Sequence, residues 1–210
     1  MKRAAIAFVL AAVLAPAAGA QRASRPADDW ITTLDAPERV AGLKIPDVVA
    51  AMKLRPGDVV ADLGAGSGLF VAPLAGAAGV KGKVLAVEID PSFFPHIQRK
   101  AKAAGVANVR TIAGEPNDPK LPEPVDVALL HDVLHHIENP AAYVTSLAKY
   151  LKPTARIVIV DYLVKQGPHR DDPSLQVGKD EAAKLLAAIG FKPVDDLALF
   201  PDKYFVIYRR

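Results

Sequence analysis

Glycines at alternate positions follow a short apolar run and carry the most distinctive chemistry of this chain. Residues 59–63 are apolar except for Asp62, and Gly64, Gly66 and Gly68 follow before another apolar segment. Glycine has no Cβ and tolerates positive φ, so such a turn lets a ligand approach the backbone closely. A helix starting there adds the positive end of its dipole. The spacing predicts a strand, a bare turn and a helix that hold a nucleotide-like molecule; the alternative is a tight turn without a ligand.

The glycine spacing separates this turn from two common phosphate-binding loops. A dinucleotide loop requires G-x-G-x-x-G, and Leu69 stands where the third glycine would be. A Walker A loop requires Gly-Lys followed by Ser or Thr, but Gly82-Lys83 is followed by Val84. The pattern that fits is D-x-G-x-G-x-G over residues 62–68.

This pattern resembles motif I of the class I S-adenosylmethionine-dependent methyltransferases, in which the loop holds the methionine part of the cofactor. The resemblance implies S-adenosyl-L-methionine as cofactor and a small-molecule methyl acceptor as partner. It assigns cofactor contacts to the loop residues Asp62, Gly64, Ala65, Gly66 and Gly68.

A second acidic position follows the next apolar run. Residues 84–90 form a predicted strand that ends in Glu88 and Asp90, and Glu88 lies 20 residues beyond Gly68. Nucleotide-binding α/β folds place an acid there to accept hydrogen bonds from ribose hydroxyls. Either acid would also serve as a helix cap. We assign Glu88 to the ribose, as the resemblance implies, and Asp90 to the cap.

A third acid stands in the stretch 114–122, which is similar to the G-D-A-x-x-L-P-x-P segment of the same family. The resemblance implies that Glu115 meets the adenine amino group. Pro116 departs from the pattern because it has no N–H to donate to the adenine ring. Adenine is then held differently, through Asn117 or Asp118, or less tightly; a solvated acidic loop is the alternative.

The fourth predicted strand occupies residues 125–130, and histidines cluster directly after it. Ligands of open α/β sheets bind beyond the carboxyl ends of strands, so His131 and Asp132 are expected at the mouth of the cleft, and we count His131 among the cofactor contacts. His135 and His136 complete three histidines within six residues. No further cluster of ligand residues is evident, so no metal site is predicted. The stretch resembles a D-V-L-H-H-I-x-x-P segment of small-molecule methyltransferases.

A general base is the chemistry we assign to the histidines, because an acceptor with an ionisable O–H or N–H gains from proton removal. The catalytic candidates are His135, His169 and His131. A buried structural histidine is the alternative for His135 or His136. His169 belongs to a polar loop, residues 165–178, that either lines the acceptor pocket or is mobile and solvated.

The elements that must position these residues alternate between strand and helix. Predicted strands occupy residues 59–63, 84–90, 108–113, 125–130 and 156–160, with closing strands at 194–200 and 203–209. Predicted helices occupy residues 46–54, 70–79, 91–105, 140–151 and 179–189. Pro46 is expected at the first position of its helix. Another begins with Asn139 as cap and Pro140 at the first position, and ends at Lys152-Pro153.

These elements and the resemblance imply an α/β fold: a doubly wound, mostly parallel, seven-stranded sheet with helices on both faces and a C-terminal antiparallel hairpin. This is the Rossmann-like methyltransferase fold. We expect the domain to span residues 46–210, after a polar lead-in at 21–45 whose Trp30 packs on the domain surface or caps the cleft.

The first residues follow the plan of a secretory signal peptide. Lys2 and Arg3 precede an apolar run at 4–14, and residues 18–20 form an A-x-A cleavage site, so residues 1–20 are expected to be removed. The formal net charge of +3 for all 210 residues then falls to +1. We expect a periplasmic or secreted protein without a stable membrane span; an uncleaved anchor is the alternative.

Composition excludes some partners and leaves two functions open. The chain has no cysteine and no dense basic patch with aromatics, so thiol catalysis is absent and nucleic acid is not an expected partner. We predict a methyltransferase acting by in-line displacement. Because S-adenosylmethionine is made in the cytosol and the leader indicates export, the alternative is an exported, non-catalytic S-adenosylmethionine or nucleoside-binding module. A nicotinamide oxidoreductase is disfavoured by Leu69.

Overall fold

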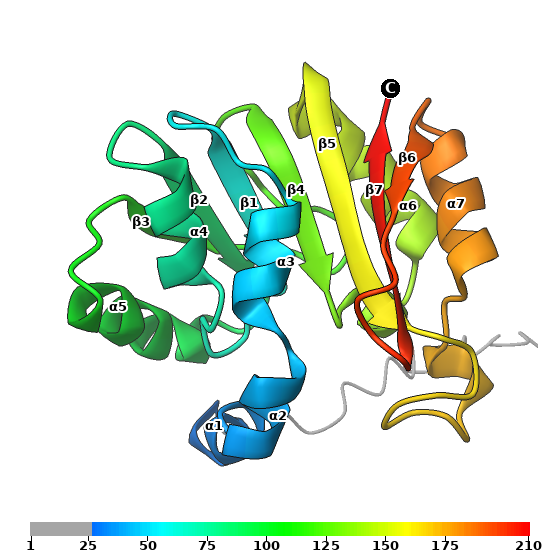
Figure 1. Ribbon diagram of the computed structural model, residues 1–210, viewed down its shortest axis with the longest axis horizontal. Helices are drawn as coiled ribbons and strands as arrows, with labels where there is room; N and C mark the ends of the chain where they lie inside the picture. The colour runs from blue at the N-terminus through cyan, green and yellow to red at the C-terminus, as the bar shows by residue number, and fades with distance from the viewer. Residues whose placement is uncertain (1–26) are drawn as a thin grey trace, which may run out of the picture.

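Seven strands form one mixed sheet in the computed structural model, which describes residues 27–210 (Figure 1). The strand order is β3-β2-β1-β4-β5-β7-β6, and β7 runs antiparallel to the other six strands. The strands are β1 (Val59–Leu63), β2 (Lys83–Glu88), β3 (Val109–Ala113), β4 (Val125–His131), β5 (Leu151–Tyr162), β6 (Lys192–Asp196) and β7 (Lys203–Arg209). The predicted fold class, with its C-terminal antiparallel hairpin, is confirmed.

Helices cover both faces of the sheet (Figure 1). One face packs against α6 and α7, and the other against α3, α4 and α5. The helices are α1 (Ala27–Leu34), α2 (Pro37–Gly42), α3 (Ile45–Ala51), α4 (Val71–Ala78), α5 (Phe94–Ala103), α6 (Pro140–Leu147) and α7 (Lys179–Ala187). Short 3-10 turns occupy Pro91–Phe93, Leu134–His136, Ala148–Tyr150 and Pro173–Leu175.

The central strand shows why an unbroken apolar run becomes a parallel strand. All residues of β1 are buried, and they alternate between the two cores: Ala61 and Leu63 face α6 and α7, whereas Val60 faces α3 and α4. A strand with helices on both faces has no solvated side, so it needs apolar residues at every position. Asp62 is the exception, and it stands at the end of the strand next to the glycine loop.

The local signals at helix starts are confirmed. The Asn139 side chain accepts the backbone N–H of Ala142, with Pro140 as the first helical residue. Asp90 accepts the N–H of Ser92 and caps the turn that leads into α5. Helix α3 differs slightly, because it begins at Ile45 and Pro46 takes its second position.

Two predicted boundaries were wrong. Helix α6 ends at Leu147, and Leu151 pairs with Val125 as the first residue of β5 instead of continuing the apolar helix face. A register shift between Val125 and Val127 accommodates the residues after Leu151, so Lys152-Pro153 lies within the irregular start of β5. Strand β6 covers Lys192–Asp196 instead of 194–200, because its partner residues on β7 end at Val206.

The predicted lead-in is helical where the structure describes it. Helices α1 and α2 precede α3, and Trp30 on α1 is 41% exposed. The predicted signal peptide lies outside the described residues. Among residues 27–210, no helix combines the length and apolar character needed to cross a bilayer.

Candidate functional site

The glycine loop connects β1 to α4 and adopts the backbone conformation that its sequence requires. Gly64, Gly66 and Gly68 all have positive φ, at 72°, 52° and 83°. A Cβ on Gly64 would lie 2.3 Å from Cγ2 of Val133, and one on Gly68 would lie 3.0 Å from the backbone of Ile97. At Gly66 the nearest atom would be Cδ1 of Leu34, at 3.6 Å. Gly64 and Gly68 therefore serve packing, and Gly66 keeps the surface of the loop bare.

The loop is tied to the end of β2 through its own N–H groups. Gly64 and Ala65 both donate to the carbonyl of Val87 at 2.9 Å, and Gly66 donates to Oε2 of Glu88 at 3.0 Å. The sequence predicts a loop whose backbone a ligand can approach closely, but three of its N–H groups are used inside the fold. They place the Glu88 carboxylate directly at the glycine loop.

Glu88 is oriented before any ligand arrives. Its Oε1 accepts the N–H of Ile89 at 2.8 Å and of Asp90 at 3.2 Å, in addition to the Gly66 bond on Oε2. Burial raises the pKa of Glu88, and the three N–H donors oppose that rise. A carboxylate offers about four lone-pair directions, so one direction is left for a hydroxyl. A second ribose hydroxyl would bind only by displacing one of the N–H donors.

Asp62 adds a second carboxylate next to Glu88. Its side chain is 4% exposed, and its Oδ2 has no hydrogen-bond partner. Burial, together with the negative charge of Glu88, raises the pKa of Asp62 to about 7. An unpaired buried acceptor costs stability until a donor reaches it. The atom is therefore suited to a hydrogen-bonding or cationic group of a ligand held at the glycine loop.

Replacing Asp62 with asparagine tests this buried charge. The folded chain retains the Asp62 proton up to about pH 7, whereas an unfolded aspartate releases it near pH 3.8. The contribution of Asp62 to stability is therefore complete below pH 4 and declines as pH rises towards 7. Asp62→Asn removes this decline, so the variant should gain roughly 2–4 kcal/mol relative to the wild type by pH 8. Denaturant unfolding at pH 4 and pH 8 measures the difference; an equal difference at both pH values would contradict a raised pKa.

The N-terminal helices lie against the glycine loop through a polar contact that the sequence did not reveal. Ser67 donates through Oγ to Oδ1 of Asp35 at 2.6 Å. The ammonium group of Lys100 on α5 bonds Asp35 Oδ2 at 2.5 Å and the Ser67 carbonyl at 2.9 Å. Leu34 is the side chain nearest to the bare surface at Gly66, with its Cδ1 3.6 Å from the position of a Cβ there. Residues 34 and 35 thus form one wall over the loop.

Glu115 lies at the surface beyond β3. Its side chain is 63% exposed and pairs with Lys120 at 3.2 Å. Asp118, its bridge partner, accepts the Tyr150 hydroxyl at 3.0 Å. In this arrangement Glu115 is held by a lysine, and an adenine contact requires its side chain to leave Lys120. The adenine role of Glu115 stays a prediction.

His131 ends β4 inside an aromatic and charged cluster. The imidazole lies 4.8 Å from the Phe70 ring and 6.2 Å from the Phe200 ring, centroid to centroid. Its Nδ1 lies 3.5 Å from Oδ2 of Asp132, which also pairs with the buried Lys203 at 2.7 Å. Burial opposes ionisation of Asp132, but His131 and Lys203 hold the pKa of this carboxyl below its usual range. His131 is thus a buried residue beneath the carboxyl edge of the sheet. Lys203 is the ion-pair partner of Asp132, which the sequence did not predict.

His135 is the best-oriented histidine of the site. Its Nδ1 lies 2.6 Å from Oδ1 of Asp161, and its backbone N–H donates to Oδ2 of the same carboxylate at 3.2 Å. Because a carboxylate accepts, Nδ1 carries the proton and Nε2 is left as the basic atom. Nε2 is buried and has no partner. Asp161 is the penultimate residue of β5, so its position near a strand end was visible in the sequence, but its pairing with His135 was not.

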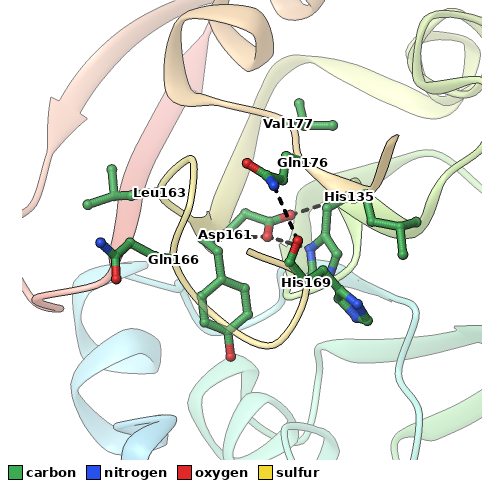
Figure 2. A pocket seen from close by; sticks show the side chains of 9 residues that line it. His135, Asp161, Leu163, Gln166, His169, Gln176 and Val177 are labelled. Carbon is green, nitrogen blue, oxygen red and sulfur yellow. Dashed lines mark hydrogen bonds and ion pairs between the residues drawn. The ribbon is translucent and has the colours of Figure 1, made fainter. Parts of the chain in front are cut away.

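His169 comes to the same place from the loop after β5 (Figure 2). Gln176 holds this loop: its Nε2 donates to the carbonyls of His169, Arg170 and Asp172 at 3.2, 3.0 and 3.3 Å. The loop forms a small cavity of about 10 Å³ with His135 and Asp161, room for about one water molecule. The catalytic candidates His135 and His169 are therefore neighbours, with ring centroids 5.5 Å apart, and His131 contacts a different set of rings.

Gly167 allows the backbone of the loop after β5 to pack closely against the Tyr162 ring. It has φ of 73°, and a Cβ there would lie 2.4 Å from Cδ1 of the Tyr162 ring. We expect Gly167→Ala to destabilise the fold by roughly 1–3 kcal/mol through this overlap and the left-handed backbone. Gly105→Ala is the matched control, because Gly105 also has positive φ but its Cβ would meet nothing within 4 Å. Equal losses of unfolding free energy in the two variants would show that the loop does not rest on Tyr162.

Comparison with known proteins shows which families and structures the chain resembles. Residues 61–157 match the family described as Methyltransferase domain. Over those residues the chain matches a methyltransferase domain, and the relatives and solved structures that it resembles are methyltransferases. Arsenite methyltransferase of Halobacterium salinarum is 28% identical over 89% of this chain and 46% of that protein. Ribosomal protein L11 methyltransferase of Thermus thermophilus is 32% identical over 70% of this chain and 51% of that protein. The chain thus spans about half the length of these two relatives.

A solved structure extends the likeness to the whole fold. The structure of a SAM-dependent methyltransferase from Aquifex aeolicus superposes with a TM-score of 0.77 at 24% identity, covering 88% of this chain and 98% of that one. Three features of the glycine loop and its surroundings fit S-adenosylmethionine as the cofactor. Gly66 leaves a bare surface, Asp62 Oδ2 lacks a partner, and Glu88 faces the loop with an acceptor direction to spare.

Proposed function

We propose that the protein transfers the methyl group of S-adenosylmethionine to a hydroxyl oxygen of a small-molecule acceptor, with His135 as general base. The observation that carries this proposal is the His135–Asp161 pair, which presents an unpartnered Nε2 at the carboxyl edge of the sheet that also holds the glycine loop. The carboxyl ends of parallel strands share one edge, so the base and the cofactor loop face the same region.

The sulfonium supplies an electrophilic methyl group whose transfer leaves a neutral thioether. The acceptor oxygen forms the new bond to the methyl carbon as the carbon–sulfur bond breaks, and the acceptor proton goes to Nε2 of His135. Asp161 then stabilises the resulting imidazolium through Nδ1. Base catalysis of this kind contributes about 10²–10⁴ in rate, and alignment of the two reactants supplies most of the remainder.

The surroundings of His135 support a small acceptor. The side chain is 4% exposed, and the cavity beside it is enclosed by the loop that carries His169 and Gln176. Because the cavity has room for about one water molecule, Nε2 is open only to a group of about the size of a hydroxyl, which suits a small acceptor more than the surface of a large partner. The chain also has no cysteine, and thiolates are the ligands that a soft metalloid centre prefers.

Methyl transfer can be tested directly with S-adenosylmethionine carrying a labelled methyl group. The acceptor panel contains phenols, hydroxyquinones, amines, arsenite and an unfolded protein mixture. We expect labelled product and S-adenosylhomocysteine with a hydroxylated small molecule, and loss of the product in His135→Gln with cofactor affinity retained. Labelled protein, amine or arsenite instead would overturn the acceptor class. Cofactor binding without transfer to any acceptor would favour the non-catalytic binding module.

We also propose that the protein is exported. The support is the basic, apolar and A-x-A order of residues 1–20. Fusing residues 1–24 to a reporter enzyme that is active only outside the cytosol tests this, with a fusion lacking residues 4–14 as control. Equal reporter activity in the two fusions would overturn export.

A further inference from the structure

Three histidines from two separate segments meet beside β5. His135 and His136 belong to the 3-10 turn after β4, and His169 comes from the loop after β5. One ring nitrogen from each of the three lies within 4.8 Å of the others. The ring centroids are 4.1 Å apart for His135 and His136, and 5.1 Å apart for His136 and His169. In the sequence, His131, His135 and His136 stand close together without a further cluster of ligand residues, and no metal site was predicted. In the fold, His169 joins His135 and His136 in place of His131.

We propose that His135, His136 and His169 bind a divalent transition-metal ion of the zinc type. Neutral imidazole is a common ligand of Zn²⁺ and its neighbours in the first transition row. Three protein ligands with a fourth position open is also the arrangement of zinc sites that act on a bound water or substrate. Metal binding at these residues goes beyond methyl transfer and does not depend on it.

Asp161 supports the proposal because it does for His135 what outer-sphere carboxylates do at metal sites. Metal-bound histidines donate their second ring N–H to a carboxylate or carbonyl, which fixes the tautomer and the ring orientation. Asp161 Oδ1 takes that N–H at 2.6 Å, and the remaining Nε2 is buried without a partner, on a residue only 5% exposed. An oriented imidazole nitrogen that is buried without a hydrogen-bond partner is available to coordinate a metal ion.

The spacing of the nitrogens requires a small closure. Around a tetrahedral zinc with bonds of about 2.0–2.1 Å, ligand nitrogens lie roughly 3.4 Å from one another. The three ring nitrogens now lie within 4.8 Å of one another, so metal binding requires them to come closer through rotation of the rings or a shift of the His169 loop. That loop lies outside the sheet and is held mainly by Gln176, so it can move without breaking strand pairing. The adjoining cavity of about 10 Å³ offers room for the fourth ligand, a water or an acceptor oxygen.

A bound metal would change how the site activates an acceptor. A nitrogen that holds a metal cannot also accept a proton, so the base role of His135 applies to the metal-free protein. In the metal-loaded protein the ion would favour the ionised acceptor instead. A divalent ion does this by lowering the pKa of a bound oxygen. The same imidazole cluster would then position the acceptor oxygen.

Binding of Zn²⁺ and Co²⁺ to the chelator-treated, tag-free protein tests the site without cofactor or acceptor. We expect one zinc per chain by calorimetry, and a Co²⁺ complex whose visible absorption is that of a four- or five-coordinate site. His136→Ala, which removes the most solvent-facing ligand, should lower the zinc affinity at least about 100-fold. Asp161→Asn should lower it about 10–100-fold, as loss of an outer-sphere partner does.

His96→Ala is the matched control, because His96 pairs with Asp28 on α1 instead of joining the cluster. Its zinc affinity should equal that of the wild type, and circular dichroism should show that each variant is folded. Absence of stoichiometric zinc uptake, or equal loss in His96→Ala and His136→Ala, would overturn the site. Failure of methyl transfer would leave these binding results unaffected, so the two proposals are judged separately.

Discussion

Gly66→Val is expected to weaken binding of S-adenosylmethionine at least about 30-fold while the chain stays folded. Gly66 has φ of 52°, a conformation that costs a β-branched residue more than the roughly 1–2 kcal/mol paid by other L-residues. The valine side chain would also occupy the bare loop surface, where only Leu34 lies within 4 Å of a Cβ apart from the Gly64 carbonyl. Together these effects should weaken cofactor binding at least about 30-fold. Calorimetric titration with S-adenosylmethionine and with S-adenosylhomocysteine measures the loss.

Gly76→Ala is the control for the Gly66 substitution. Gly76 lies within α4, a Cβ there would meet nothing within 4 Å, and alanine favours helix over glycine by about 1 kcal/mol. This variant should bind the cofactor as the wild type does and unfold at the same or a higher temperature. Wild-type affinity in Gly66→Val would remove the glycine loop from the cofactor site.

Asp161→Asn is expected to lower kcat about 10²–10⁴-fold with little change in cofactor affinity. The carboxylate accepts Nδ1–H of His135 and stabilises the imidazolium that forms when Nε2 takes a proton. Asparagine removes the negative charge and can present an N–H to the ring, which favours the wrong tautomer. Asp161 acts through His135, so it is a positioning residue, and the separation of kcat from cofactor affinity distinguishes this role from a general loss of structure.

Asp126→Asn serves as the matched control for Asp161. Asp126 lies near the amino end of β4, away from the carboxyl ends that carry the site. Its Oδ2 accepts the N–H of Val59 at 2.8 Å and pairs with Lys152 at 2.6 Å. Its replacement should reduce the free energy of unfolding and leave kcat unchanged. Equal effects of the two variants on kcat would mean that Asp161 contributes stability alone.

The fold was predictable where local chemistry and tertiary packing agree. The alternating strand and helix order, the Asn139 cap and the final antiparallel hairpin were all visible, because burial on both faces demands unbroken apolar strands and caps demand particular side chains. The boundary at Leu151 was wrong for a physical reason. Its apolar spacing continues the face of α6, but pairing with Val125 on β4 outweighs one further helical turn.

The candidate site was predictable in its residue types more than in its contacts. The acid at Glu88 was expected to meet a ligand, and the structure shows it already holding Gly66, Ile89 and Asp90 N–H groups. Lys203 pairs with Asp132 from 71 positions away in the sequence, and no local sequence pattern predicts such a pair. Long-range side-chain pairing depends on strand order, which propensity and spacing do not encode.

The sequence by itself determined the glycine loop, the carboxyl-edge acids and the class of cofactor, since each depends on residue types at short spacing. Tertiary structure alone decided that His169 joins His135 and His136, that Asp161 orients His135, and that Asp35 covers the loop through Ser67. The physical reason is that parallel strands bring their carboxyl ends to one edge. Segments distant in the chain become neighbours there, and the chemistry of the site depends on which of their side chains meet.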